Sequence, residues 1–231
     1  RTFDSLKIPK DFRIIGTLNT ADKHYLFPLS DALKSRFSII EIDVPEKKLK
    51  DKEIFYALKH AMEHLELKKH YEVILDENKK IVLSRQPYEL FPIIYQAYNF
   101  LSFVRQFNKL GTAILKIIYQ NLLSGHQLKA NLNDMLDNSI NSTIIPQLEK
   151  LSELELGAIN AMINGKLLDF LKDVNKTNKR HNSSKVFSKI LKFLNLNSND
   201  YEYFTESVLK DDDKLWGEIE SSLSKLNLDE N

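Results

Sequence analysis

The spacing of hydrophobic and polar positions changes once along the chain, near residue 45. Before it, two short apolar runs rich in β-branched residues, 12–18 and 37–42, predict buried β-strands. A short helical stretch, 30–35, is expected between them. After Pro45, apolar residues recur at i, i+3, i+4 and i+7, which is typical of amphipathic helices. The pattern therefore predicts an α/β beginning followed by a predominantly α-helical remainder.

The helical part is predicted to contain a hairpin and a series of helices with short breaks. Helical spacing indicates helices at 54–65, 88–107, 114–123, 131–150 and 153–172, and two or three shorter ones around 186–195, 201–210 and 214–227. Lys50, Lys52, Glu53 and Lys59 are assigned to the polar side of the first helix. Pro146 is expected to break or kink its helix. Residues 71–83 favour a small hairpin, and the polar, basic stretch 173–185 is expected to be a loop.

The composition narrows the classes of protein that fit. The 231 residues include 33 basic and 32 acidic side chains, and a net charge of +1 gives no support to polyanion binding by bulk electrostatics. The absence of cysteine excludes a disulfide scaffold, a cysteine nucleophile and a thiolate metal site. No apolar run approaches the about 20 residues that span a bilayer, and no signal-peptide pattern follows Arg1. We expect a cytoplasmic protein without a membrane segment, and a chain that is a piece of something longer.

The most informative motifs lie in residues 8–45. Their sequence, IPKDFRIIGTLNTADKHYLFPLSDALKSRFSIIEIDVP, gives the order strand, polar tip with asparagine, short helix, Arg-Phe, strand and proline. This order resembles the second half of the nucleotide-binding core of AAA+ ATPases. The resemblance is closest to the McrB-like and MoxR-like (dynein-related) members, in which a GT-N-TAD tip precedes an AL–RF segment. The helical region behind it is similar to the lid of that family in length and order.

The resemblance implies three parts: 1–45 as the end of the αβα core of a P-loop NTPase, 46–128 as a helical lid, and 129–231 as a helical extension. It also implies ATP or GTP with Mg²⁺ in the full-length protein, a homo-oligomeric ring, often hexameric, and remodelling or translocation of a protein or DNA substrate. The P-loop string G-x-x-x-x-G-K-[S/T] and the acidic metal-binding strand end that should precede residue 12 are absent from these 231 residues. This chain alone is therefore expected neither to bind nucleotide tightly nor to hydrolyse it.

Three side chains match functional positions of that family. Asn19 follows the first apolar run and matches the sensor-1 asparagine, whose amide can hydrogen-bond water beside the γ-phosphate. Arg36 matches the arginine finger, which in a ring would reach the nucleotide of a neighbouring subunit, and its guanidinium suits phosphate oxygens. Arg105 is the candidate for the sensor-2 arginine acting on the chain's own nucleotide, and Lys109 is the alternative.

Other patterns have simpler interpretations. His60, Glu63 and His64 fit the zinc-peptidase string H-x-x-E-H, but an exposed face of an amphipathic helix is favoured because a convincing third ligand is missing. The basic residues of 172–185 lack interleaved aromatic residues, so a solvated loop is favoured over a nucleic-acid contact. The alternative function is a helical protein-interaction or DNA-binding module without catalysis.

Overall fold

The computed structural model describes residues 9–17, 35–38, 40, 42–65, 71–75, 81–84, 89–177, 181–196 and 213–228. Helices account for 69% of the residues within these ranges, so the fold class is predominantly helical, as predicted. The chain separates into two compact units, Arg1–Ile42 and Asp43–Asn231. The further division after residue 128 stays a prediction.

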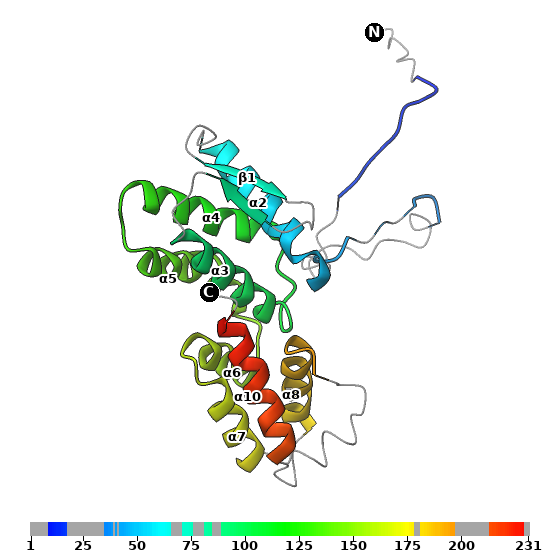
Figure 1. The fold of residues 1–231 in the computed structure, drawn as a ribbon. Coiled ribbons are helices and arrows are strands. Elements are labelled where there is room, and N and C mark those ends of the chain that lie inside the picture. Colours follow the sequence, from blue (N-terminus) through cyan, green and yellow to red (C-terminus); the bar gives the residue numbers. More distant parts are fainter. Residues whose placement is uncertain are drawn as a thin grey trace. The chain divides into compact units, whose positions relative to one another are not determined.

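The second unit begins with four helices and a hairpin (Figure 1). The elements are the 3₁₀ turn η2 (Lys47–Leu49), α2 (Lys50–His64), β1 (Glu72–Leu75), β2 (Ile81–Ser84), α3 (Leu90–Val104), α4 (Thr112–Gln127) and α5 (Leu132–Thr143). The two strands pair antiparallel, with Val73 opposite Leu83, and this confirms the predicted hairpin.

The core of this part is built from apolar residues at helical spacing. Ile54 and Leu58 of α2 are at most 1% exposed, and Ile118 and Leu122 of α4 are fully buried. Each pair is four residues apart, so both side chains of a pair lie on one face of their helix. Full burial of one such side chain contributes about 1.5–3 kcal/mol. The packing of α2 on α4 and of α4 on α5 follows from these faces.

The remaining described elements complete the second unit. They are the 3₁₀ helix η4 (Ile145–Leu148), α6 (Glu153–Ile163), α7 (Leu167–Thr177), α8 (His181–Phe193) and α10 (Asp213–Leu228). Pro146 lies in η4, just beyond the end of α5, which agrees with its predicted effect. Among the described residues, no helix is long and apolar enough to cross a membrane.

Two predictions about this region are wrong. The single helix expected at 153–172 is divided into α6 and α7, and Gly165 between them has a φ of +64° that glycine adopts without steric cost. The loop expected at 173–185 is largely helical, because α7 continues to Thr177 and α8 begins at His181. Polar composition indicated a loop, but the apolar positions in both helices are buried in the core.

The first unit differs from the prediction in another way. Its described residues contain neither helix nor strand, and the Phe12 amide donates to the Pro9 carbonyl in a turn at 3.1 Å. Ile15 and Ile42 are 90% and 91% exposed. An isolated apolar segment gains neither ladder hydrogen bonds nor burial without neighbouring strands. The predicted strands, and with them the α/β character of 1–45, are therefore not confirmed.

Candidate functional site

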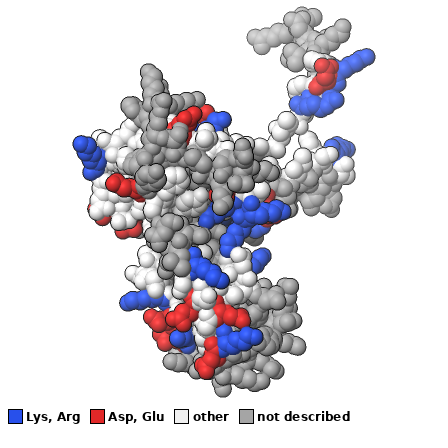
Figure 2. All heavy atoms as spheres, in the orientation of Figure 1, with Lys and Arg blue, Asp and Glu red and all other residues white. Residues whose placement is uncertain are grey.

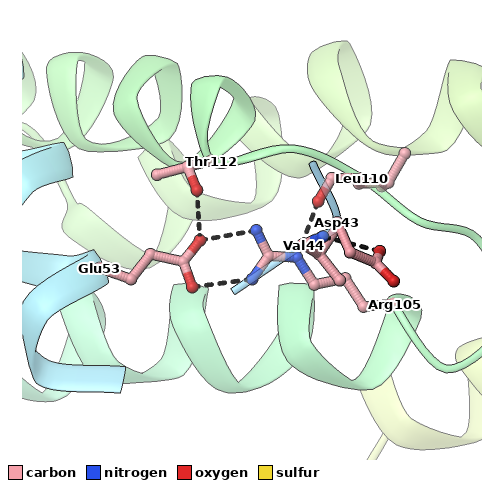
Figure 3. A network of polar contacts seen from close by, with 6 residues as sticks. All are labelled: Asp43, Val44, Glu53, Arg105, Leu110 and Thr112. Carbon is pink, nitrogen blue, oxygen red and sulfur yellow. Dashed lines mark hydrogen bonds and ion pairs between the residues drawn. The ribbon is translucent and has the colours of Figure 1, made fainter. Parts of the chain in front are cut away.

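A buried charge network joins α2, α3 and α4 (Figure 3). The Arg105 guanidinium donates to Glu53 through Nη1–Oε2 at 2.9 Å and Nη2–Oε1 at 2.6 Å. The side chains of Arg105 and Glu53 are 4% and 1% exposed. The Nε of Arg105 also donates to the Leu110 carbonyl at 2.8 Å, and the Thr112 hydroxyl donates to Oε1 of Glu53 at 2.7 Å. The two buried charges are thus paired and further hydrogen-bonded.

The elements that carry these side chains explain what the network fixes. Glu53 lies in the first turn of α2, Arg105 follows the last residue of α3, and Thr112 begins α4. The hydrogen bond from Arg105 to the Leu110 carbonyl holds the connection between α3 and α4 against the C-terminal end of α3. Removal of one partner from a buried pair leaves an uncompensated charge and costs about 3–5 kcal/mol. The network therefore ties the three helices and one connection into a single arrangement.

The surroundings of this network are apolar and include two tyrosines. Burial raises the pKa of Tyr98 to about 12, and the negative charge of Glu53 adds to this effect. Burial also raises the pKa of Tyr119 well above its ordinary value, again with a contribution from Glu53. The Tyr119 hydroxyl donates to the carbonyl of Ile94 at 3.1 Å. Both phenols therefore stay neutral at physiological pH. The positive partner of Glu53 is Arg105.

Lys109 occupies a different environment from Arg105. It lies on the connection between α3 and α4, and its Nζ is 2.7 Å from Oδ2 of Asp43. The side chains of Lys109 and Asp43 are 69% and 58% exposed. The hydrogen bond from Lys109, together with the Val44 amide, lowers the pKa of the Asp43 carboxyl. Of the two sensor-2 candidates, Lys109 is therefore at the surface and Arg105 is internal.

The other predicted site residues belong to the first unit. Asn19 lies outside the residues that the structure describes, as does most of the expected strand tip. Arg36 is described; it lies in a turn and is exposed. The roles assigned to Asn19, Arg36 and Arg105 by the family resemblance stay predictions.

The H-x-x-E-H residues lie on α2. Nδ1 of His60 is 3.3 Å from Oε2 of Glu63, and His60 and His64 are exposed. Over the described ranges, no group of three or more histidine or acidic side chains is placed to hold a metal ion. The His60–Glu63 pair is an i, i+3 surface contact of an amphipathic helix.

The sequence interpretation assigned Glu53 to the polar side of α2, and this is wrong, because its side chain is only 1% exposed. The spacing of residues along α2 contained a sign that Glu53 is buried. Glu53, Ala57 and Ala61 are four residues apart, and all three are buried along the same row of α2. Small alanines in such a row allow a neighbouring helix to approach closely, so the glutamate ahead of them faces the interior.

Comparison with protein-family models, with curated proteins and with solved structures finds no match to this chain. We therefore infer its function from the motifs in 8–45 and from the geometry of the helical unit.

Proposed function

We propose that this chain is the C-terminal part of a subunit of a ring-forming AAA+ ATPase of the McrB-like or MoxR-like group. The full protein would couple nucleoside triphosphate hydrolysis to the remodelling or translocation of a macromolecule. One observation carries the proposal: Gly16-Thr17, Asn19-Thr20-Ala21-Asp22 and Arg36-Phe37 occur together in the order and at the spacing of that family. Each motif alone fits a common turn or surface position, but the combination is specific.

The exposure of the first unit supports this interpretation. A strand in the middle of an αβα core is covered on both faces and has apolar side chains throughout. The segments around Ile14, Ile15, Ile40 and Ile42 have this composition, and all four side chains are between 68% and 91% exposed. Apolar segments of this kind are stabilised when neighbouring strands and helices cover them. The remaining strands of an AAA+ core would provide that cover.

The proposed roles follow the chemistry of phosphoryl transfer. Asn19 would orient the attacking water at the γ-phosphate, and Arg36 would neutralise charge on the nucleotide of the neighbouring subunit. ATP or GTP with Mg²⁺ would be held mainly by a P-loop, which these 231 residues do not contain. Residues 46–128 would form the lid over that nucleotide.

Of the two sensor-2 candidates, the geometry favours Lys109 in our proposal. Arg105 would have to leave Glu53 before contacting a phosphate, and breaking such a pair costs about 3–5 kcal/mol. The ion pair of Lys109 with Asp43 is exposed, and exposed pairs contribute about 0–1 kcal/mol, so exchanging Asp43 for a phosphate would cost less. Arg105 would then act indirectly, by fixing the connection that carries Lys109.

The proposal is tested on the protein that contains these residues together with the sequence encoded before them. Arg36→Ala is expected to lower kcat for nucleoside triphosphate hydrolysis by about 10³-fold or more. Arg13→Ala is the matched control, because Arg13 is exposed in the same unit and its Nη1 donates to the backbone carbonyls of Lys10 and Phe12. Wild-type turnover by Arg36→Ala, or the absence of a P-loop from the complete protein, would refute the proposal.

A further inference from the structure

The helical unit contains a basic cleft whose described lining residues do not include Arg36, Arg105 or Lys109. The cleft has a volume of about 620 Å³ and is lined by residues of η2, α2, α3, α10 and the C-terminal end of α8. Its charged lining residues are Lys47, Lys50 and Lys225, and no carboxylate is among the described lining residues. Amide and hydroxyl groups are added by Asn99, Ser102, Asn195 and Ser222. We propose that this cleft binds a small phosphate-bearing molecule.

Lys47 is held at one wall of the cleft. Its Nζ donates to the carbonyl of Phe193, the last residue of α8, at 2.8 Å. The same ammonium group lies 5.2 Å from the centroid of the Phe193 ring. Partial desolvation lowers the pKa of Lys47, and the positive charge of Lys50 lowers it further. Two cationic side chains are thus close enough to repel each other, and a bound anion would relieve that repulsion.

Lys50 is positioned by aromatic rings on α3. Its Nζ lies 4.7 Å from the ring centroid of Tyr95 and 5.8 Å from that of Tyr98. These contacts keep the side chain against the protein surface instead of extended into solvent. Figure 2 shows Lys and Arg side chains gathered on the face drawn, over the start of α2. In the sequence, η2 contains Lys47 and Lys48, and the first turn of α2 contains Lys50 and Lys52. The positive charge is therefore concentrated beside the cleft.

The size and chemistry of the cleft fit a small phosphate-bearing ligand better than a long nucleic acid. A volume of about 620 Å³ is within the usual range of small-molecule sites. Lysine ammonium groups bind phosphate as point charges, and the neighbouring amide and hydroxyl groups can donate to phosphate oxygens. A long nucleic acid needs an extended basic surface, whereas this chain has a net charge of only +1. The inference does not depend on the ATPase proposal, because none of the described lining residues belongs to 8–45.

Calorimetric titration of the chain with inorganic pyrophosphate tests the inference. We expect saturable binding with one site per chain, and about tenfold weaker binding for Lys47→Gln and for Lys50→Gln. Lys59→Gln is the matched control, since Lys59 is an exposed lysine of the same helix outside the cleft. Lys47→Arg keeps the charge and should retain binding, which separates loss of the cation from loss of the fold.

Several outcomes would overturn the inference. One is the absence of saturable heat when pyrophosphate is added. Another is that Lys59→Gln weakens pyrophosphate binding as much as Lys47→Gln and Lys50→Gln do. Tighter binding of a single-stranded oligonucleotide, with the same lysine dependence, would point to an extended polyanion surface instead. If Lys47→Gln failed to fold, Lys225→Gln at an exposed position of α10 would provide the same test, because Lys225 also lines the cleft.

Discussion

Glu53 and Arg105 are 52 positions apart in the sequence, yet they form a bidentate ion pair in which neither side chain is more than 4% exposed. The pair joins the first turn of α2 to the end of α3, and Thr112 extends it to α4. Attraction between buried charges is offset by the cost of removing them from water. The network therefore mainly fixes one arrangement of the three helices. Its net contribution to the free energy of unfolding is not large.

This interpretation predicts strong non-additivity between the two positions. Glu53→Met and Arg105→Met should each lower the free energy of unfolding by about 3–5 kcal/mol, because each leaves a buried charge without its partner. The double variant should lose clearly less than the sum, since it removes both charges. Urea unfolding of the four proteins measures the coupling energy. Additive losses would mean that the pair does not act as a unit.

The helices were largely predictable because their apolar faces are formed by local spacing. The positions of Ile54, Leu58 and Met62 predicted the buried face of α2, and all three are buried. Polar composition was a poorer guide, since it assigned 173–185 to a loop. The partner of Glu53 was not predictable from spacing, because a contact between distant helices depends on how they pack.

Glycines in two helices provide a test of that packing. A Cβ added to Gly125 of α4 would lie 2.7 Å from Cγ of Met135 on α5, whereas a Cβ on Gly217 of α10 would meet nothing within 4 Å. Alanine is favoured over glycine in a helix by about 1 kcal/mol, and overpacking costs about 1–3 kcal/mol. Gly217→Ala should therefore raise the free energy of unfolding by about 0.5–1 kcal/mol, and Gly125→Ala should lower it. Equal stabilisation by both, measured in urea, would contradict the close approach of α4 and α5.

Glu155 links the start of α6 to α8 and should make stability depend on pH. Its Oε1 accepts from Nζ of Lys189 at 2.7 Å, and its Oε2 accepts from the Ser152 amide at 3.1 Å. Desolvation alone would raise the pKa of Glu155, but the hydrogen bonds from Lys189 and Ser152 lower it below the ordinary value of 4.5. The stabilisation is present above pH 4.5 and is lost as the pH falls through the lowered pKa of the folded protein.

Glu155→Gln should therefore flatten the decline in stability at acidic pH. Above pH 5 we expect the variant to be less stable by about 0.5–1 kcal/mol, because the pair is partly exposed. Below the pKa of the folded protein the difference should shrink. Glu153→Gln, at an exposed position of the same turn, should leave the pH profile unchanged. A constant difference between wild type and Glu155→Gln from pH 3 to 7 would be inconsistent with this ion pair.

The candidate site was less accessible to prediction than the helices. Motif order in 8–45 indicated Asn19 and Arg36, but in the proposed ring Arg36 would act on the nucleotide of a neighbouring subunit, so the complete site would need more than one subunit. Arg105 was selected from its position along the chain, and the structure places its guanidinium inside the helical unit. The cleft beside Lys47 had no sequence signal, because its walls come from elements distant in sequence.

We propose that Asn19 acts on the chain's own nucleotide and that Arg36 acts on the nucleotide of a neighbouring subunit. Nucleoside triphosphate turnover by a mixture of Asn19→Ala and Arg36→Ala forms of the complete protein tests both roles at once. Each variant alone should be inactive, but a mixed ring contains sites with an intact asparagine and an arginine from the next subunit. In an equal mixture, turnover should recover to roughly a quarter of the wild-type rate if subunits exchange randomly and sites act independently. A mixture as inactive as its two components, in rings shown to exchange subunits, would contradict the claim.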